Sequence, residues 1–270
     1  MLTRVLVSLL FLISIQAQAG PKLYVFDCGV ATLESMAMFN LKESDTEVRD
    51  IFVPCYMIEH AKGRLLWDGG LPKEIADAEG AVPSDGTSMS YDRWIVDQLA
   101  DMGLMPSDIN YAAYSHLHFD HAGAANFFVE SKVIMQQKEW DSAFGTAAEY
   151  IDTSLFDGLR QADVTFIEGD YDVFGDGSVR LISSPGHTPG HQVLLVTLEN
   201  TGKILLSGDL YHTRANRRLR RAPIFNYDAE ETQASMDKVE RLLAETGATL
   251  WIEHDKALAD TLKKAPAFYD

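Results

Sequence analysis

The sequence predicts an α/β protein in which two β-sheets are covered by helices on their outer faces. Two observations carry this prediction. Short apolar segments typical of strands occur in clusters between helical segments, without the regular strand–helix alternation of a βαβ fold. Several of these segments end at a histidine, an aspartate or a Pro-Gly sequence, so side chains from separate strands can meet at one sheet edge. A chain of 270 residues is long enough for one large domain with a well-covered core.

Strands are predicted from short apolar or β-branched runs bounded by glycine, proline or polar residues. They cover residues 24–28, 52–58, 64–67, 111–114, 179–184, 192–198, 203–206 and 249–252. The run at 64–67 ends at Asp68-Gly69-Gly70, and the run at 111–114 leads into Ser115-His116. The last two runs lead to Asp209 and His254 in the same way.

Helices are predicted where apolar residues recur every three or four positions. Residues 91–102 have this spacing and are followed by Gly103, a typical helix end. Residues 229–246 are predicted to form an amphipathic helix, whose apolar face carries Met236, Val239, Leu242 and Leu243. A helix is expected to begin within 122–128 and surface helices within 136–162, whereas residues 71–90 are predicted to form a loop rich in glycine, proline and serine.

The N-terminal segment has the features of a secretory signal peptide. Arg4 precedes an apolar run over residues 5–13, and Ala17-Gln18-Ala19 is a small-x-small cleavage pattern before Gly20. The run is too short for a comfortable membrane span, although an uncleaved N-terminal anchor is the alternative. We therefore expect a periplasmic or secreted protein with residues 1–19 as signal peptide and residues 20–270 as a single domain.

The charge balance is acidic, with 40 Asp and Glu against 23 Lys and Arg and a formal net charge of −17. Such a surface repels nucleic acid and anionic lipid. We expect no nucleic-acid partner and, after signal cleavage, no membrane partner. The composition suits a small neutral or cationic substrate and leaves the oligomeric state open, with a homodimer as one option.

The only cysteines are Cys28 and Cys55, and both fall in predicted strands. Export permits a disulfide between them if the two strands pair, because the Cα atoms must lie within about 7 Å. Two buried free thiols are an equal alternative. Two cysteines cannot form a Cys-rich zinc site, so any metal must be held by histidines and carboxylates.

Three histidines and an aspartate fall within six residues, in the segment His116-Leu117-His118-Phe119-Asp120-His121. In an extended segment, His116 and His118 point to the same side. Asp120 and His121 follow the bend and can face a second metal, and Gly123 lets the chain turn tightly afterwards. Imidazole and carboxylate groups that converge in this way are typical metal ligands, so the segment predicts a metal site.

The segment from His116 to Gly123 resembles the signature of the metallo-β-lactamase superfamily, whose fold is an αββα sandwich with a binuclear metal site on its edge. Four further segments resemble motifs of that superfamily, and the resemblance covers roughly residues 22–260. These segments are Leu66-Trp67-Asp68-Gly69-Gly70, Pro185-Gly186-His187-Thr188-Pro189-Gly190-His191, Gly208-Asp209 and Glu253-His254-Asp255.

The resemblance implies two zinc ions, or other divalent transition metals, each held by three residues and sharing a seventh. The first ion would bind His116, His118 and His187. The second would bind Asp120, His121 and His254. Asp209 would bridge the two. Of the other candidates, Asp68 is expected to orient a ligand histidine and His191 to be structural or to support the ligands, whereas His60 is expected to be a plain surface residue.

Within the superfamily, the ligand spacing and the Glu253-His254-Asp255 ending are most similar to the N-acyl homoserine lactonases, which are quorum-quenching enzymes. This similarity implies a small-molecule lactone as substrate and attack on its carbonyl by a hydroxide that bridges the metals, with Asp120 passing a proton to the leaving ring oxygen. The alternatives are a β-lactamase or another ester or amide hydrolase of the same fold. A binding protein that has lost the chemistry is disfavoured by the complete ligand set.

Position 212 departs from the lactonase pattern. That family commonly has a tyrosine three residues after the bridging aspartate, where it contacts the substrate carbonyl, and this chain has His212 there and Tyr211 beside it. Either Tyr211 reaches the substrate, or His212 takes this role, or neither does.

A basic run follows Asp209 and consists of Arg214, Arg217, Arg218, Arg220 and Arg221. We expect a solvated face paired with nearby acids or a subunit contact, with recognition of a substrate anion as the alternative.

Overall fold

The computed structural model describes residues 20–146 and 151–270. The predicted signal peptide, residues 1–19, lies outside them, as do residues 147–150 of the region predicted to form surface helices. In the described residues, no helix is long and apolar enough to cross a membrane.

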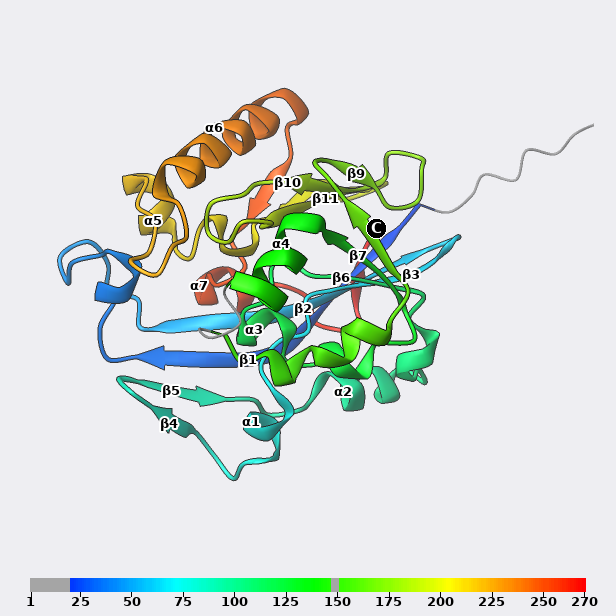
Figure 1. Cartoon of the computed structure of the whole chain (residues 1–270), viewed down its shortest axis with the longest axis horizontal. Helices are drawn as coiled ribbons and strands as arrows, with labels where there is room; N and C mark the ends of the chain where they lie inside the picture. The colour runs from blue at the N-terminus through cyan, green and yellow to red at the C-terminus, as the bar shows by residue number, and fades with distance from the viewer. Residues whose placement is uncertain (1–19, 147–150) are drawn as a thin grey trace, which may run out of the picture.

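The strands form two mixed sheets that face each other (Figure 1). Among the described residues, the first sheet has nine strands in the order β4-β5-β1-β2-β3-β6-β7-β8, with β14 also paired to β1. They are β1 (Lys22–Leu33), β2 (Asp50–His60), β3 (Gly63–Trp67), β4 (Val82–Ser84), β5 (Thr87–Ser90), β6 (Tyr111–Ala113), β7 (Lys132–Gln136), β8 (Val164–Ile167) and β14 (Phe268–Tyr269). The second sheet has its strands in the order β13-β12-β11-β10-β9. The strands of this second sheet are β9 (Tyr171–Asp172), β10 (Val179–Ser183), β11 (Gln192–Leu198), β12 (Gly202–Leu206) and β13 (Thr249–Trp251).

Helices cover the outer face of each sheet. They are α1 (Lys73–Asp77), α2 (Ile95–Asp101), α3 (Phe119–Ala122), α4 (Gln137–Asp141), α5 (Arg214–Leu219), α6 (Ala229–Thr246) and α7 (Lys256–Ala259). Short helical turns add η1 (Ala37–Phe39), η2 (Pro106–Asp108), η3 (Ala125–Phe127), η4 (Ser142–Thr146), η5 (Thr153–Leu155), η6 (Asp157–Gln161) and η7 (Gly208–Leu210). In Figure 1, α6 (orange) lies over β10 and β11, and α2 lies on the opposite side of the molecule. The predicted αββα sandwich is confirmed.

Three apolar cores correspond to these layers. Between the sheets, Trp67 of β3 packs with side chains such as Leu194 of β11. Outside the first sheet, Leu99 of α2 belongs to a second core, and outside the second sheet Met236 and Val239 of α6 belong to a third. Burial of such side chains removes apolar area from water at roughly 25 cal/mol per Å² and fixes the layers against each other.

Helix α6 has the predicted bounds, because each end has its own signal. The Asp228 side chain accepts hydrogen bonds from the backbone N–H groups of Glu230 and Glu231, and Gly247 ends the helix with a φ of +67°. Helix α2 is shorter than predicted: residues 91–94 have the apolar spacing of a helix, but Trp94 is extended, with φ −60° and ψ 148°. The side chains of Tyr91 and Trp94 are buried in the core, although they precede the helix.

The predicted loop at 71–90 was wrong in part, because it contains α1 and the β4–β5 hairpin, whose turn is Asp85-Gly86. Strands β7, β8, β9 and β14 were not predicted either. The two strands that carry the cysteines pair with each other, and of the two alternatives the structure has the disulfide, Cys28–Cys55, with a Cα–Cα distance of 5.7 Å. The register between β1 and β2 shifts between Asp27 and Val30, the stretch of β1 that contains Cys28.

Candidate metal centre

The predicted ligands meet at one edge of the sandwich. His116 and His118 follow β6, Asp120 and His121 lie in α3, and His187 lies between β10 and β11. Asp209 lies in η7 directly after β12, and His254 follows β13. Since β12 and β13 are parallel, their carboxyl ends reach the same edge, as the sequence predicted.

The segment after β6 is extended up to His118, which has φ −74° and ψ 160°, and turns into α3 at Phe119. Gly123 has an ordinary helical backbone, with φ −57° and ψ −28°, so the expected tight turn is not the reason for a glycine there. The reason is close approach: a Cβ at this position would lie 2.4 Å from the carbonyl oxygen of Gly70.

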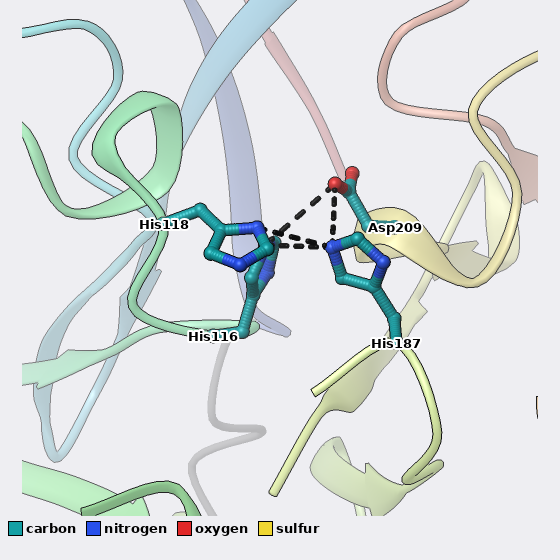
Figure 2. Close-up of side chains that lie close together, drawn as sticks. All are labelled: His116, His118, His187 and Asp209. Carbon is teal, nitrogen blue, oxygen red and sulfur yellow. Dashed lines mark hydrogen bonds and ion pairs between the residues drawn. The ribbon is translucent and has the colours of Figure 1, made fainter. Parts of the chain in front are cut away.

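The first ligand group consists of His116, His118, His187 and Asp209 (Figure 2). The nitrogens His116 Nε2 and His118 Nδ1 lie 2.9 Å apart, and His187 Nε2 lies 3.2 Å from each. Asp209 Oδ2 lies 3.1 Å from His187 Nε2 and 3.6 Å from His116 Nε2. Four atoms bound tetrahedrally at 2.0–2.1 Å from zinc would be about 3.3–3.4 Å apart, so these spacings fit such a site.

The second ligand group consists of Asp120, His121 and His254. The Nε2 atoms of both histidines lie 3.8 Å from Asp120 Oδ2. They also face the second oxygen of Asp209, since Oδ1 is 3.2 Å from His121 Nε2 and 2.8 Å from His254 Nε2. Each oxygen of Asp209 thus faces a different group, which is the arrangement expected of a bridging ligand.

The unpartnered atoms of the centre test whether a metal fits. Among the described residues, His121 Nε2, His254 Nε2 and Asp209 Oδ1 are buried and find no aligned hydrogen-bond partner. Buried polar atoms in proteins are almost always satisfied, and an unsatisfied one costs about 1–3 kcal/mol. Because these atoms converge on one another, divalent cations bound there would satisfy them together. The donor set of imidazoles and carboxylates, without sulfur, suits zinc and neighbouring transition metals.

The two groups differ in charge. Burial and neighbouring imidazoles lower the pKa of His116 well below its usual value, and burial lowers that of His118 to about 3. These rings are neutral at pH 7, the state that binds metals. Burial opposes a charge on His254, but Asp209 raises its pKa to about 9, and three carboxylates raise the pKa of His121 in the same way. The protons on His121 and His254 therefore balance the negative charge of the nearby carboxylates. A divalent cation bound there would replace these protons and balance the same charge.

Asp68 holds His121 from behind, as expected. Its Oδ2 lies 2.8 Å from His121 Nδ1, and Oδ1 accepts a 2.6 Å hydrogen bond from the backbone N–H of Ser115. Asp68 has a φ of +59°, an uncommon value for a residue other than glycine. This backbone conformation directs a fully buried carboxylate to Nδ1 of His121 and leaves Nε2 of the same ring facing Asp209.

Two further buried groups hold the turn that carries Asp209. His191 Nδ1 donates to the carbonyl oxygen of Ser184, and Nε2 accepts the N–H of Asp209 at 2.9 Å, so both ring nitrogens are used in holding the turn of Asp209. Burial lowers the pKa of His191 to about 3, which keeps Nε2 an acceptor. Glu253 Oε1 accepts the N–H of Gly208 at 2.9 Å, and burial raises the pKa of Glu253 to about 8.

Sequence reasoning missed Glu139, which joins two ligand loops. From α4, its Oε1 accepts the N–H of Leu117 at 2.9 Å. Its Oε2 accepts the Thr188 hydroxyl at 2.6 Å and the N–H of Gly190 at 3.0 Å. The buried carboxylate thus connects the loop of His116 and His118 to the loop of His187. A glutamate within the region predicted to form surface helices carried no signal of this role.

Two of the predicted residues lie outside the centre. Tyr211 is corrected as a substrate-contacting candidate: its ring is buried beneath α6 and its hydroxyl donates to Glu240 Oε1 at 2.9 Å. His60 is not a plain surface residue, because its side chain is only 5 % exposed, stacks on Phe174 and lies 2.9 Å from Asp176 Oδ2. His212 does lie in the centre, with Nε2 3.0 Å from Asp209 Oδ2.

The arginine run is paired with nearby acids, as favoured from the sequence. The ion pairs are Arg214–Asp255, Arg217–Glu240, Arg220–Asp237 and Arg221–Asp45. Arg218 donates instead to the backbone carbonyl of Asp45.

Comparison with known proteins is consistent across sequence and structure. The family model of the metallo-beta-lactamase superfamily matches residues 48–246. The N-acyl homoserine lactonase AttM of Azorhizobium caulinodans is 35 % identical over 236 residues, covering 82 % of this chain and 88 % of that protein. An N-acyl homoserine lactonase of a Bacillus species is 32 % identical over 242 residues, covering 87 % and 93 %. An N-acyl homoserine lactone hydrolase solved with N-hexanoyl-L-homoserine at its catalytic metal centre has a TM-score of 0.78 at 27 % identity, covering 93 % and 99 %.

Proposed function

The chain belongs to the metallo-β-lactamase superfamily, and we propose that it is a metal-dependent lactonase that opens the ring of N-acyl homoserine lactones. The observation that supports this proposal is the position of Asp209, with one oxygen facing each of the two groups of potential metal ligands. The named activity of the relatives, whose similarity extends over more than four-fifths of the chain, supports the choice of substrate.

Seven residues would hold the metals, which we propose are two zinc ions. His116, His118 and His187 would bind the first, Asp120, His121 and His254 the second, and Asp209 both. When bound, the ions would supply Lewis acidity and a water that ionises near neutral pH.

The chain's own residues then position the lactone and move one proton. The oxygen of water bonds to the ester carbonyl carbon, the bond from that carbon to the ring oxygen breaks, and the ring oxygen needs a proton to leave as a hydroxyl. Asp120 can carry this proton, because its side chain is 14 % exposed whereas the ligand histidines of its group are almost fully buried. The product is the opened N-acyl homoserine.

His212 would orient the substrate carbonyl. Burial lowers the pKa of His212, so the ring is neutral at pH 7 and carries a single N–H donor. Phe39 packs against the ring at a centroid distance of 4.7 Å and holds it beside Asp209. His212 Nε2 faces Asp209 Oδ2 at 3.0 Å, so we propose that this N–H would become available to the substrate carbonyl oxygen when Asp209 binds the metals, as negative charge develops on that oxygen.

The test of the reaction uses purified, zinc-loaded protein with N-hexanoyl homoserine lactone and, separately, a cephalosporin. Proton release is expected with the lactone and little with the cephalosporin, and the reverse preference would refute the lactonase proposal. Asp209→Asn is expected to lose bound zinc and most activity. Asp163→Asn is the matched control, since Asp163 is exposed.

The role of His212 has its own test. His212→Ala is expected to keep two zinc ions and to lose about 10²-fold in kcat, the effect of removing one donor to a developing oxyanion. Unchanged kcat with full zinc content would show that His212 does not touch the substrate carbonyl.

We also propose that the protein works outside the cytoplasm. The Cys28–Cys55 disulfide supports this, because disulfides persist in oxidising compartments. Cell fractionation and N-terminal sequencing test it: the expected mature protein begins at Gly20 and is found in the periplasm or medium, and a full-length cytoplasmic protein would contradict the proposal.

A further inference from the structure

An exposed apolar segment lies against the metal centre between α5 and α6. In residues 222–228, the side chains of Ile224, Phe225 and Tyr227 are 73 %, 42 % and 67 % exposed. Exposed apolar side chains that are grouped on one segment often mark a binding surface, whereas single ones are ordinary. None of the metal-binding motifs includes this segment, and the reaction proposed above assigns it no role.

Phe225 covers part of the ligand cluster. Its ring centroid lies 5.8 Å from that of His187, 5.8 Å from that of His212 and 6.4 Å from that of His118, in edge-on arrangements. The ring of Phe39 also contacts Phe225, with 5.9 Å between the two ring centroids. One side of the Phe225 ring therefore rests on the first ligand group while the rest faces solvent. A molecule that binds the centre from this side would contact the exposed part of the ring.

The segment is held on both sides of Phe225. The N–H of Ile224 donates to the carbonyl oxygen of Met38 at 2.9 Å, and the N–H of Tyr227 donates to that of His187 at 3.1 Å. The Asn226 side chain donates to the carbonyl oxygen of Gly186 at 2.9 Å. Since these bonds tie the segment to the loop that carries His187, the ring keeps its place beside the centre and forms a fixed wall.

We infer that Phe225 forms an apolar wall that contacts the acyl chain of the substrate and sets the preference for chain length. The inference rests on the proposed lactonase function. An apolar wall beside a polar reaction centre suits a substrate that joins a reactive ester to a hydrocarbon chain, because the chain buries the exposed face of the ring while the lactone reaches the metals.

The experiment compares N-butanoyl and N-decanoyl homoserine lactone as substrates of the zinc-loaded protein and of Phe225→Ala. For the decanoyl substrate, kcat/KM is expected to fall about tenfold, mainly through a higher KM, and for the butanoyl substrate to change less than about twofold. Phe225→Leu is expected to fall between wild type and Phe225→Ala. The matched control is Phe166→Ala, because Phe166 is 43 % exposed but lies on β8 against Trp140.

Zinc content and thermal unfolding of each variant show that the centre is intact. Equal losses on both substrates, no loss on either, or a gain on the decanoyl substrate would each overturn the inference. A fall in molecular mass of Phe225→Ala in sedimentation would also overturn it, because the segment would then join two copies of the chain. A wild-type protein that opens neither lactone would refute the proposed function and this inference with it, whereas activity on both that Phe225→Ala leaves unchanged refutes the inference alone.

Discussion

Glu139→Gln tests whether the carboxylate that joins two ligand loops holds the centre together. The wild-type side chain offers two acceptor oxygens to three donors, the N–H of Leu117, the hydroxyl of Thr188 and the N–H of Gly190. Glutamine has nearly the same size but only one oxygen. Whichever way the amide turns, its NH₂ group faces a backbone N–H, so a buried donor loses its acceptor.

The size of the effect follows from these contacts. One unsatisfied buried N–H costs about 1–3 kcal/mol, and a hydrogen bond to a neutral oxygen is about half as strong as one to a carboxylate. Burial raises the pKa of Glu139 despite its three hydrogen bonds, so the charged side chain carries a desolvation cost that glutamine avoids. We expect a net loss of about 2–3 kcal/mol in the free energy of unfolding, and a loss of about 10–100-fold in zinc affinity.

Urea unfolding measures the stability, and competition with a chelator measures the zinc affinity. Glu130→Gln is the control, because Glu130 is exposed and the same chemical change there should leave both quantities unaltered. If Glu139→Gln unfolds within about 0.5 kcal/mol of wild type and binds zinc equally well, then Glu139 does not position the ligand loops.

Three further outcomes are expected. Replacing Cys28 and Cys55 with serine should lower stability by about 3.5 kcal/mol in a chain-entropy estimate for a separation of 27 residues, and a loss under 1 kcal/mol in urea unfolding would contradict it. Hydrogen bonds from Arg217 lower the pKa of Glu240 from its usual value of about 4.5, so their contribution is present above that value and is lost as pH falls through the folded-state pKa. Glu240→Gln should therefore be about 0.5–1 kcal/mol less stable than wild type at pH 7, this difference should shrink as the pH falls through the folded-state pKa of Glu240, and a pH-independent difference would contradict this. Zinc at 100 times its dissociation constant should stabilise chelated protein by about 2.7 kcal/mol per site, and an unchanged melting temperature would count against binding.

Local signals account for the parts of the fold that the sequence predicted well. Strand β11 and helix α6 have the predicted bounds because a continuous apolar run and an amphipathic period are properties of the segments themselves. Strands β7 and β8 were missed although each has an apolar or β-branched run, because both runs are short and directly flank the region 136–162 that was predicted to form surface helices. The β4–β5 hairpin had a local signal, Asp85-Gly86 between two short runs, which the loop-like composition around it concealed.

The same distinction applies to the site. The seven predicted ligands lie in motifs that can be recognised along the chain, and the structure brings them together. Glu139 and Phe225 carry no motif, because their positions depend on contacts between segments far apart in sequence: Glu139 lies 22 residues from Leu117 and 51 from Gly190. Tyr211 was a reasonable candidate from its neighbours, but the chain direction after η7 turns its side chain toward α6.

A zinc titration of chelated protein, monitored by hydrolysis of N-hexanoyl homoserine lactone, tests the central claim most directly. Activity is expected to be absent without metal and to reach its maximum at two zinc ions per chain, with the metal content measured on the same sample. Lactone hydrolysis that persists in metal-free protein, or none at any zinc concentration, would contradict the account of a binuclear lactonase.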